Sequence, residues 1–536
     1  MNAASIVGAV LAAAMAAQAA PPLKSATRPV GNLSGPNPYE SNAVLTGENP
    51  IDKLVLDRLT QLGIKPARVC SDAAFVRRVH LDVIGTLPTE QEAKDFLASK
   101  DPNKRPALID RLLEREEFAD YWAMKWSDLL RIKAEFPINL WPNAAQAYHR
   151  WVRTSIRENK PYDRFVRELL TASGSNFRVP PVNFYRAMQS REPQSIAQAV
   201  ALTFMGTRAD KWPKDRLAGM AAFFSQVAFK ATGEWKEEIV FFDPAKAAEA
   251  ATRPATQPAP AFPDGTAAKL APDRDGREAF ADWLVDAKNP YFARAIVNRL
   301  WCWLLGRGIV HEPDDIRPDN PPSNPALLAY LEKELVGSRF DLKHVYRLVL
   351  NSKTYQLSCI PPTGRPEGAV NFSHYPLRRL EAEVLIDALC QITGTTEKYT
   401  SPIPEPFTFI PESHRTIALP DGSITSSFLE TFGRSPRDTG LESERNNRVT
   451  ADQRLFLLNS SQVQRKIEQG PKLRPILSKG NLGEIATSLY LTILSRYPTE
   501  EERKVVAGYS KSGRTREAAI DLAWALINSA EFLFRH

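Results

Sequence analysis

Cysteine is scarce in this sequence. Four cysteines occur among 536 residues, at Cys70, Cys302, Cys359 and Cys390, and no two of them lie within four residues of each other. This spacing excludes a CxxC pair for zinc and a CxxCH motif for covalently attached haem. It is compatible with buried free thiols, and also with one or two disulfides, of which Cys359–Cys390 would join the cysteines that are closest in sequence.

Histidine is also scarce, and the usual catalytic motifs are missing. The seven histidines never come closer than 30 residues apart, so a histidine metal cluster or a catalytic triad would have to be assembled by the fold. The sequence contains no HExxH, no GxSxG, no glycine-rich phosphate loop and no GxGxxG turn. We therefore expect no metal site and no cofactor.

Charge of one sign does not dominate the chain. Lys and Arg number 69 and Asp and Glu 62, which gives a net charge of +7, and no block of five or more like charges occurs. This mild excess is spread along the chain, and we expect no nucleic-acid partner. A hydrophobic content of 43% with 24% charged residues is ordinary for a globular protein and excludes a disordered or fibrous one.

Long apolar runs are absent after the first residues. The twelve-residue apolar stretch from Ile6 to Ala17 leads into Ala17-Gln18-Ala19, the small-x-small pattern that signal peptidases cleave. A bilayer needs about 20 apolar residues. We therefore expect a signal peptide at 1–19, no transmembrane segment and a periplasmic or extracellular location. The first residues carry no Lys or Arg, and an alanine-rich disordered tail is the alternative interpretation.

Hydrophobic periodicity divides the rest of the chain into two helical parts. Residues 20–48 are predicted to be an irregular lead-in, and 49–244 to form a first helical domain. An Ala/Pro-rich linker follows at 245–275, and a second helical domain at 276–536. The predicted fold is mainly α, a two-part helical bundle with a short β element near 238–243 and long irregular loops.

Helices are expected where apolar residues recur at spacings of three and four. A capping box at Thr89-Glu90-Gln91-Glu92 marks one helix start, and Asn289-Pro290 opens another. The other predicted helices are 104–115, 117–132, 143–158, 161–172, 193–205, 213–229, 277–287, 325–336, 341–352, 378–392, 450–468, 482–495, 499–510 and 514–530. The stretch 400–449 has little periodicity, and a loop of that length is either functional or disordered.

Two patterns recur within the chain. His80–Glu90 is echoed by Tyr490–Glu500 at a constant offset of 410 residues. A helix-end pattern also recurs, at 113–118, 350–355 and 527–532. Because the separations are unequal, the chain is not a solenoid. We predict that one type of helical hairpin is reused in both parts, with coincidence as the alternative.

The most polar segment of the chain is 434–448, which carries four arginines and three carboxylates. Three interpretations are open: a solvated loop, an ion-pair cluster that clamps the two parts together, or a ligand site. Arginines can hold an anion through bidentate contacts. The candidate binding residues of this segment are Arg434, Arg437, Asp438 and Arg445, and the candidate catalytic residues are Glu442 and Glu444.

A second charged cluster lies at 378–387, on the predicted helix 378–392. Its candidate binding residues are Arg378, Arg379, Glu381 and Glu383. On a helix, Arg379, Glu383 and Asp387 would form an i,i+4 ladder, so intrahelical pairing is the structural alternative to binding. The tryptophans, such as Trp122 and Trp126, are expected in the core rather than in a sugar-stacking groove. A binding site requires 378–387 and 434–448 to meet in one concave pocket.

Several of these stretches together resemble a known pair of domains. The chain is similar to the N-terminal domain of unknown function 1549 at Arg77–Thr89 and Tyr121–Ala123. It is similar to domain of unknown function 1553 at Asn289–Arg299, Tyr375–Glu383 and Leu457–Ser460. The resemblance covers nearly everything after residue 49, and its motifs are long and specific.

The resemblance implies a context but no reaction. The family is typical of planctomycetes and verrucomicrobia, and its members are exported, often carry a fused cytochrome c domain, and are commonly encoded beside a sulfatase-like secreted protein. Many relatives have a Cys-x-x-Cys-His-x-His-Pro run where this chain passes from Phe204–Arg208 through Ala209–Pro213 to Ala221–Phe224. Neither that run nor a cytochrome domain is present here, which disfavours electron transfer.

Three functions follow as expectations. The leading one is a non-redox binding or scaffold role, in which the protein assists a secreted sulfatase-like or polysaccharide-processing enzyme, with that enzyme or an anionic glycan as partner. The alternative is a glycan-directed hydrolase that uses carboxylates of 434–448. The third, haem-linked electron transfer, would require haem bound without covalent attachment.

Overall fold

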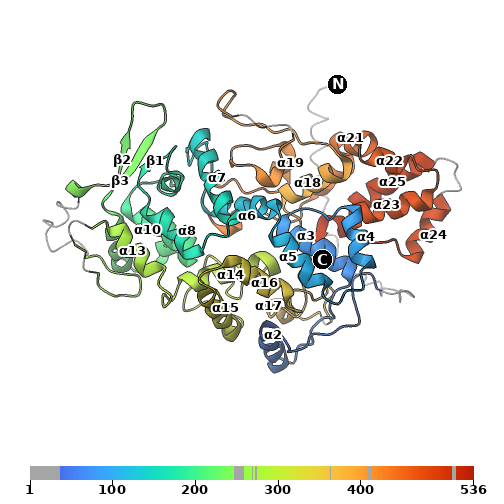
Figure 1. Ribbon diagram of the computed structural model, residues 1–536, viewed down its shortest axis with the longest axis horizontal. Helices are drawn as coiled ribbons and strands as arrows, with labels where there is room; N and C mark the ends of the chain where they lie inside the picture. The colour runs from blue at the N-terminus through green and yellow to red at the C-terminus, as the bar shows by residue number, and fades with distance from the viewer. Residues whose placement is uncertain are drawn as a thin grey trace, which may run out of the picture. The chain divides into compact units, whose positions relative to one another are not determined.

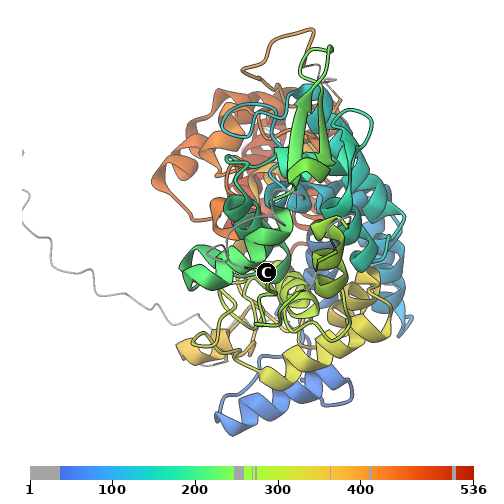
Figure 2. The same cartoon turned by 90° about the vertical axis from the view of Figure 1, so that its left-hand side faces the viewer.

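The computed structural model describes residues 37–246, 259–268, 270–271, 274–362, 364–408, 410, 413–509 and 515–536 (Figures 1 and 2). The predicted signal peptide at 1–19 lies outside the described residues. So do most of the predicted lead-in and residues 247–258 of the predicted linker. Residues Pro38–His536 form one compact unit.

Helices make up most of the described structure, which confirms the mainly α prediction. In the first part of the chain they are α2 (Pro50–Gln61), α3 (Asp72–Ile84), α4 (Glu90–Ala98), α5 (Lys104–Leu113), α6 (Glu116–Leu129), α7 (Pro142–Arg157), α8 (Tyr162–Thr171), η1 (Pro180–Val182), α9 (Asn183–Arg186), α10 (Pro193–Met205), η2 (Ala209–Lys211), α11 (Lys214–Ala221) and η3 (Ala222–Phe224).

The second part of the chain is also mostly helical. Its helices are α13 (Gly276–Leu284), α14 (Phe292–Leu305), α15 (Pro325–Gly337), α16 (Leu342–Asn351), α17 (Pro366–Val370), α18 (Ala382–Thr393), η4 (Thr416–Ala418), α19 (Ser427–Thr431), η5 (Glu442–Glu444), α20 (Ala451–Asn459), α21 (Ser461–Gln469), α22 (Leu473–Leu477), α23 (Leu482–Leu494), α24 (Glu500–Tyr509), α25 (Thr515–Ile527) and α26 (Ala530–Leu533).

Strands are few and short in the described residues. One antiparallel sheet has the order β1-β3-β2, with β1 (Gly174–Ser175), β2 (Val227–Ala231) and β3 (Glu238–Phe242). The predicted β element near 238–243 is therefore present, as the central strand. A second sheet pairs β4 (Arg378–Arg379) with β5 (Phe534–Arg535), the end of the chain.

Three of the predicted helices have different ends or are divided. Predicted helix 213–229 stops at Phe224, because the following residues pair as β2 with β3. Predicted helix 378–392 begins only at Ala382, because Arg378 and Arg379 pair with β5. Predicted helix 450–468 is two helices, since the Ser460 hydroxyl accepts a hydrogen bond from the Val463 amide and caps a new helix.

The two sequence echoes correspond to repeated structure. His80–Glu90 lies in the α3–α4 hairpin, and Tyr490–Glu500 lies in the α23–α24 hairpin. The helix-end pattern is the junction of α5 with α6 at its first occurrence and of α25 with α26 at its last. The prediction of a reused hairpin is confirmed.

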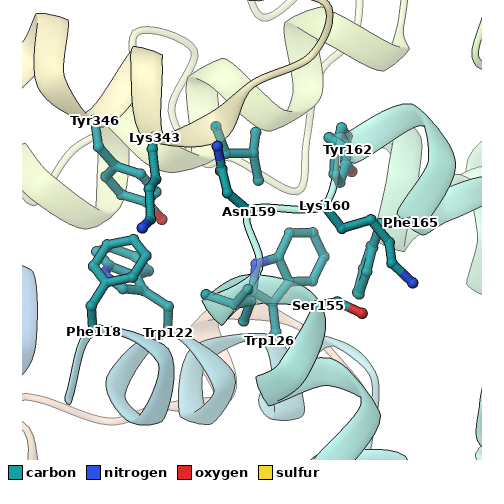
Figure 3. Close-up of a pocket in the computed structure, with 12 residues that line it drawn as sticks. Phe118, Trp122, Trp126, Ser155, Asn159, Lys160, Tyr162, Phe165, Lys343 and Tyr346 are labelled. Carbon is teal, nitrogen blue, oxygen red and sulfur yellow. The ribbon is translucent and has the colours of Figure 1, made fainter. Parts of the chain in front are cut away.

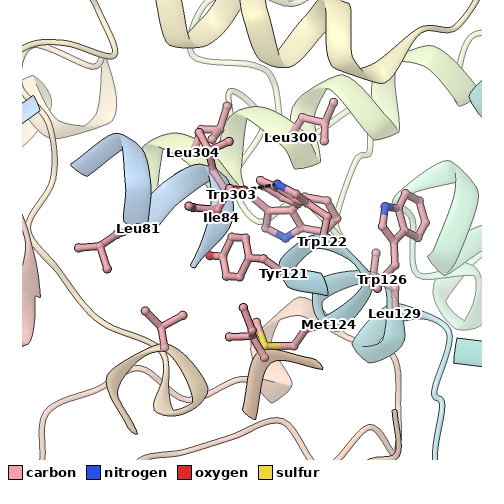
Figure 4. Packing of buried hydrophobic residues seen from close by; sticks show 14 of the residues in the cluster. Leu81, Ile84, Tyr121, Trp122, Met124, Trp126, Leu129, Leu300, Trp303 and Leu304 are labelled. Atoms are coloured by element: carbon pink, nitrogen blue, oxygen red, sulfur yellow. Dashed lines mark hydrogen bonds between the residues drawn. The ribbon is translucent and has the colours of Figure 1, made fainter. Parts of the chain in front are cut away.

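One hydrophobic core runs through both parts of the chain. Figure 4 shows its centre, where Trp122 and Trp126 of α6 pack against Trp303 of α14. The ring centroids of Trp122 and Trp303 lie 5.4 Å apart. These tryptophans are core residues, as their helical spacing predicts.

Asp82, in the last turn of α3, connects distant parts of the chain. Its fully buried carboxylate accepts hydrogen bonds from the Tyr355 and Tyr375 hydroxyls, each at 2.8 Å, and from Arg535 Nη1 at 3.0 Å. Arg378 Nη2 lies 3.5 Å from the same carboxylate. Asp82 thus fixes Arg378, one of the predicted binding residues, against the last strand of the fold.

Candidate functional site

A cavity of about 210 Å³ lies where the two predicted segments meet. Its walls come from α6, the end of α14, the loop after α14, the start of α18 and the loop around η5. The charged and aromatic side chains that line it include Lys125, Trp303, Arg378, Glu381, Glu442 and Arg445. Residues of 378–387 and of 434–448 line the same cavity, as the binding interpretation requires.

Glu381 is held in its ionised form at the base of α18. Lys125 Nζ donates to Glu381 Oε1 at 2.7 Å, and Arg535 Nη2 donates to Oε2. Burial alone would raise the pKa of this carboxyl, but Arg535 and Lys125 outweigh burial and hold it well below its usual value. A negative charge therefore stays fixed on one side of the cavity.

Arg445 links two buried carboxylates behind the cavity. It donates to Glu383 Oε2 at 2.6 Å and to Asp128 Oδ2 at 2.7 Å. Burial opposes the ionised form of Glu383, yet Arg445 and then Arg434 lower the pKa of Glu383 to about 2. Glu383 is thus anionic at neutral pH, and Arg445 is positioned by two ion pairs.

Glu442 also lines the cavity, and its pKa is shifted in the opposite direction from that of Glu381. Trp303 Nε1 donates to Glu442 Oε2 at 2.9 Å, and the Glu442 amide donates to Asp314 Oδ2 at 2.6 Å. Burial raises the pKa of Glu442 above its ordinary value, and nearby Asp314 adds to this effect against Lys125. One cavity therefore holds two carboxyl groups whose pKa values are shifted in opposite directions.

Arg378 is anchored through backbone carbonyls. Its Nη1 donates to the Trp303 carbonyl at 2.9 Å and its Nη2 to the Leu304 carbonyl at 2.7 Å. Gly306, which ends α14 with φ 72°, packs against the Arg378 side chain, and a Cβ there would lie 2.4 Å from Arg378 Cδ. This position needs glycine for both its conformation and its space.

The ladder predicted for Arg379, Glu383 and Asp387 is wrong. Arg379 precedes α18, and its guanidinium donates to the Phe432 and Asn446 carbonyls. The Asp387 carboxylate instead accepts from the Thr416 and Ile417 amides. Because the chain is extended at Arg379, the i,i+4 geometry of a helix does not exist there.

Most candidate residues of 434–448 have structural partners outside the cavity. Arg434 donates to the Asp421 carbonyl at 3.1 Å, and Arg437 donates to Asp128 at 3.1 Å. Asp438 accepts from Lys133 at 2.6 Å, and Glu444 accepts from the Asp438 amide at 2.9 Å. Glu444 therefore folds the loop on itself, and Glu442 is the carboxyl group of this loop that reaches the cavity.

The solvated-loop interpretation of 434–448 is wrong for three of its four arginines. Arg437 is 1% exposed, and the Arg434 and Arg445 side chains are 4% and 5% exposed. They join α6 of the first part to α18 of the second through Asp128 and Glu383. This is the clamp of the second interpretation, and the cavity lies beside it.

Sequence reasoning missed Lys125, Trp303 and His311 of the cavity wall. A signal for Lys125 exists, because it is a charged residue on α6, which is otherwise buried almost all round. Asp128, one turn away, shares that position and pairs with Arg437 and Arg445. Charged residues inside a largely buried helix require buried partners.

The described residues form other cavities as well. A slot between aromatic rings of α6, α7, α8 and α16, shown in Figure 3, has about 30 Å³, room for only one or two waters. A cavity of about 530 Å³ is lined by Arg208–Lys211, in the segment where relatives carry the cysteine-histidine run, and by Asp438 and Thr439. A cavity of about 670 Å³ lies beside His80 and Glu92.

All four cysteines lie in the described part of the chain and are free thiols, so Cys359 and Cys390 form no disulfide. Burial raises the pKa of Cys302, which lines the cavity, to about 12, so its thiol stays protonated at neutral pH. In the described residues no three His, Cys, Asp or Glu side chains gather as a metal site. Each described helix is too short or too polar to cross a bilayer.

Comparison with protein-family models gives two matches along the chain. Residues 50–228 match PSCyt2, described as protein of unknown function (DUF1549). Residues 276–510 match PSD1, described as protein of unknown function (DUF1553). No curated protein and no solved structure matches the chain.

Proposed function

The chain belongs to the proteins that join a DUF1549 domain to a DUF1553 domain, and we propose from its central cavity that it is a non-redox binding protein for an anionic group on a glycan. In this role it is exported and assists a secreted sulfatase-like or polysaccharide-processing enzyme. The observation that carries the proposal is the presence of three cationic side chains, Lys125, Arg378 and Arg445, in the cavity wall.

Three cationic side chains of the wall are suited to an anion. Lys125, Arg378 and Arg445 contribute positive charge to it. Glu381 contributes one fixed negative charge, and it is shared with Arg535 behind the wall. Glu312 of the wall pairs with Arg208, and burial raises the pKa of Glu442, which makes this carboxyl group easier to protonate. Guanidinium groups and carboxylic acids both donate to sulfate and carboxylate oxygens.

The size of the cavity limits what enters. Ligand sites for drug-sized molecules measure about 300–1,000 Å³, and this cavity has about 210 Å³. One charged substituent with part of its sugar ring therefore fits, and the rest of a polysaccharide stays outside. This supports recognition of a chain end or a side group.

Blocking the entrance tests the binding function without breaking the buried ion pairs. Ser443 is exposed, lies on η5 and lines the cavity. We expect Ser443→Trp to lose retention on an immobilised sulfated glycan, and to lose capture of the sulfatase-like neighbour if that enzyme docks at the same opening. The measurement is retention of purified protein as a function of salt concentration, because anion binding weakens with salt.

The matched control is Ser427→Trp, an exposed serine at the start of α19 that does not line the cavity. It should bind like the unaltered protein. If the unaltered protein retains neither ligand, or if both tryptophan variants bind equally well, the cavity does not bind anionic glycans.

A second candidate function, glycan hydrolysis, is favoured by the two carboxyl groups of the cavity. Their surroundings displace their pKa values in opposite directions, with Glu442 raised and Glu381 lowered. Such a pair is the usual basis for a general acid beside an ionised base or nucleophile. In this function Glu442 donates the proton to the leaving oxygen, and Glu381 acts in its ionised form.

Isosteric variants separate hydrolysis from binding. We expect Glu442→Gln to abolish turnover on a glycan panel while it retains binding, since the amide oxygen still accepts from Trp303. Glu444→Gln is the control, because Glu444 bonds to backbone amides of its own loop outside the cavity. Turnover that survives in Glu442→Gln would remove this residue from the chemistry.

A further inference from the structure

Three loops from distant parts of the chain place aromatic rings next to one another on the surface. Trp141 ends the loop before α7, Trp235 lies in the turn of the β2–β3 hairpin, and Phe407 follows β4 and α18 in the loop after residue 400. The hairpin tip and that loop lie side by side at the top of Figures 1 and 2. Trp235 is 72% exposed and Phe407 49% exposed.

Lys236 joins these rings into one surface. The Trp141 and Phe407 ring centroids are 5.4 Å apart. Lys236 Nζ lies 5.4 Å from the Trp141 ring and 5.5 Å from the Trp235 ring, a cation–π arrangement with both indoles. We call Trp141, Trp235, Lys236 and Phe407 the aromatic platform. Among the described residues, Lys236 makes no ion pair, so its positive charge remains uncompensated.

The backbone under the platform is held in place. The Trp141 amide donates to the Ala134 carbonyl at 3.1 Å, and the Phe407 amide donates to the Pro404 carbonyl at 3.1 Å. In the hairpin turn, the Thr232 hydroxyl donates to Glu237 Oε2 at 2.7 Å. Exposed rings on an ordered backbone bind a ligand at low entropic cost.

The large hydrophobic side chains that these loops expose are all aromatic. Phe136, on the same loop as Trp141, is 76% exposed and adds a further ring. The exposed aliphatic residues of the described chain lie elsewhere, for example Leu455 and Leu458 on α20. A lipid-facing or protein-docking patch would mix aliphatic with aromatic side chains. Flat rings beside a free ammonium group instead suit a ligand with flat apolar faces and negative charge.

We propose that the aromatic platform binds the sugar rings of a negatively charged polysaccharide. The C–H groups on one face of a pyranose ring pack against the electron-rich face of an indole or phenyl ring, while the hydroxyls remain in water. Lys236, between Trp141 and Trp235, then pairs with a sulfate or uronate group of the same chain. This site shares a ligand class with the proposed function, but it uses other residues and stands without it.

Affinity electrophoresis tests the platform on the whole chain. Native gels contain carrageenan as the sulfated polysaccharide, alginate as the uronate or dextran as the neutral one. We expect carrageenan or alginate to retard the protein more than dextran does. Trp235→Ala and Phe407→Ala should each weaken binding about tenfold or more, as loss of a central aromatic contact does. Tyr497→Ala is the control, because Tyr497 is an aromatic residue of similar exposure in the α23–α24 hairpin.

Lys236→Asn tests the charge separately, since asparagine tolerates the positive φ of 61° at this position. This variant should bind the anionic polysaccharide more weakly, and its binding should depend less on salt concentration. Its mobility in gels that contain dextran should stay unchanged. Ser443→Trp closes the central cavity but leaves the aromatic platform unchanged, so the polysaccharide gels should retard this variant as much as the unaltered protein. The two proposed sites can therefore be tested independently. Equal retardation of Trp235→Ala and the unaltered protein, or binding to phosphatidylglycerol vesicles in place of polysaccharide, would overturn the proposal.

Discussion

The α3–α4 and α23–α24 hairpins have the same local construction in two different surroundings. The first helix of each ends on a left-handed residue, Gly85 with φ 59° and Ser495 with φ 60°. The next helix is capped by Thr89 or Thr499, each in a reciprocal pair of hydrogen bonds with the glutamate three residues later. These features depend on sequence within the hairpin, so both copies form the same turn.

The first helices of the two hairpins differ in their buried charges. The helix α3 buries Arg77, Arg78 and Asp82, whereas the positions 410 residues later are Thr487, Ser488 and Thr492. The partners of the α3 charges come from Ile493 of α23, from residues 355–378 and from the end of the chain.

Each hairpin has an arginine that bridges two glutamates, but the two arginines do not occupy equivalent positions. In the first copy Arg115, at the start of α6, contacts Glu92 and Glu117. In the second copy Arg496, within the hairpin turn, contacts Glu502 and Glu531. Local sequence therefore determines the conformation of the hairpin turn, while distant residues determine which copy supports the central cavity.

The largest difference between the copies should appear at Asp82 and its counterpart Thr492. Asp82→Ala leaves Arg535 buried without one of its carboxylates and removes the acceptor of Tyr355 and Tyr375. We expect a loss of about 3–5 kcal/mol in the free energy of unfolding, measured by urea denaturation. Thr492→Ala should cost less than about 1 kcal/mol, because the half-buried threonine carries no charge. Equal losses would show that the buried carboxylate is not what distinguishes the hairpins.

The second contrast concerns the left-handed residue at each turn. In Gly85→Ala the new Cβ would lie 2.5 Å from Tyr121 Cδ2 in a conformation that disfavours a side chain, and we expect a loss of about 2–4 kcal/mol. Ser495→Gly should instead stabilise the protein by about 1 kcal/mol, since it relieves the left-handed strain at φ 60°. Thermal unfolding of both variants measures the two signs. Destabilisation by Ser495→Gly would contradict the equivalence of the turns.

The sequence predicted the parts of the fold that depend on local pattern. Helix 193–205 has the predicted bounds, and the capping box at Thr89 is present. The error at Arg378–Leu380 has a different cause: these residues pair with β5 more than 150 residues later, and periodicity carries no information about that partner. Likewise Val227–Ala231 is a strand because β3 lies beside it.

Part of the candidate site was predictable from the sequence, and part of it was not. The density of charge identified 434–448, because so many charges cannot form an apolar core, and Glu442 and Arg445 do line the cavity. Whether each arginine of this loop faces the cavity or a backbone carbonyl depends on loop geometry, as Arg434 illustrates. Lys125 comes from a helix that the apolar pattern assigns to the core, so only its buried partner Glu381 reveals its role.

The third contrast is pH dependence, because His80 has Tyr490 as its counterpart. Burial lowers the pKa of His80 to about 4, with Arg115 adding to the effect against Glu92. The folded state therefore binds fewer protons than the unfolded state, and stability present above pH 6.5 is lost as the pH falls toward 4. Tyr490 remains neutral in this range, since burial raises its pKa.

Two variants isolate this contribution in urea unfolding at pH 7 and pH 5. Between these values His80 should account for about 2 kcal/mol of the pH-dependent loss. His80→Gln should flatten the pH dependence by this amount, and Tyr490→Phe should leave it unchanged. Buried His149 and His536, whose pKa values are lowered to about 3 and about 4, maintain the remaining slope in both variants. An unchanged slope in His80→Gln would mean that His80 is protonated in the folded state.

Removing the threonine cap should have the smallest effect on the free energy of unfolding. The effect should be the same in both hairpins. Thr89→Ala and Thr499→Ala each remove a hydroxyl that accepts from the amide three residues later, and each should cost about 1 kcal/mol in the free energy of unfolding. The two losses should match within about 0.5 kcal/mol, because the cap acts within its own hairpin and does not depend on the buried charges of α3. A much larger loss for Thr89→Ala would mean that the cap of the first hairpin also maintains the packing around Asp82, and the division between local construction and distant partners would then fail at this turn.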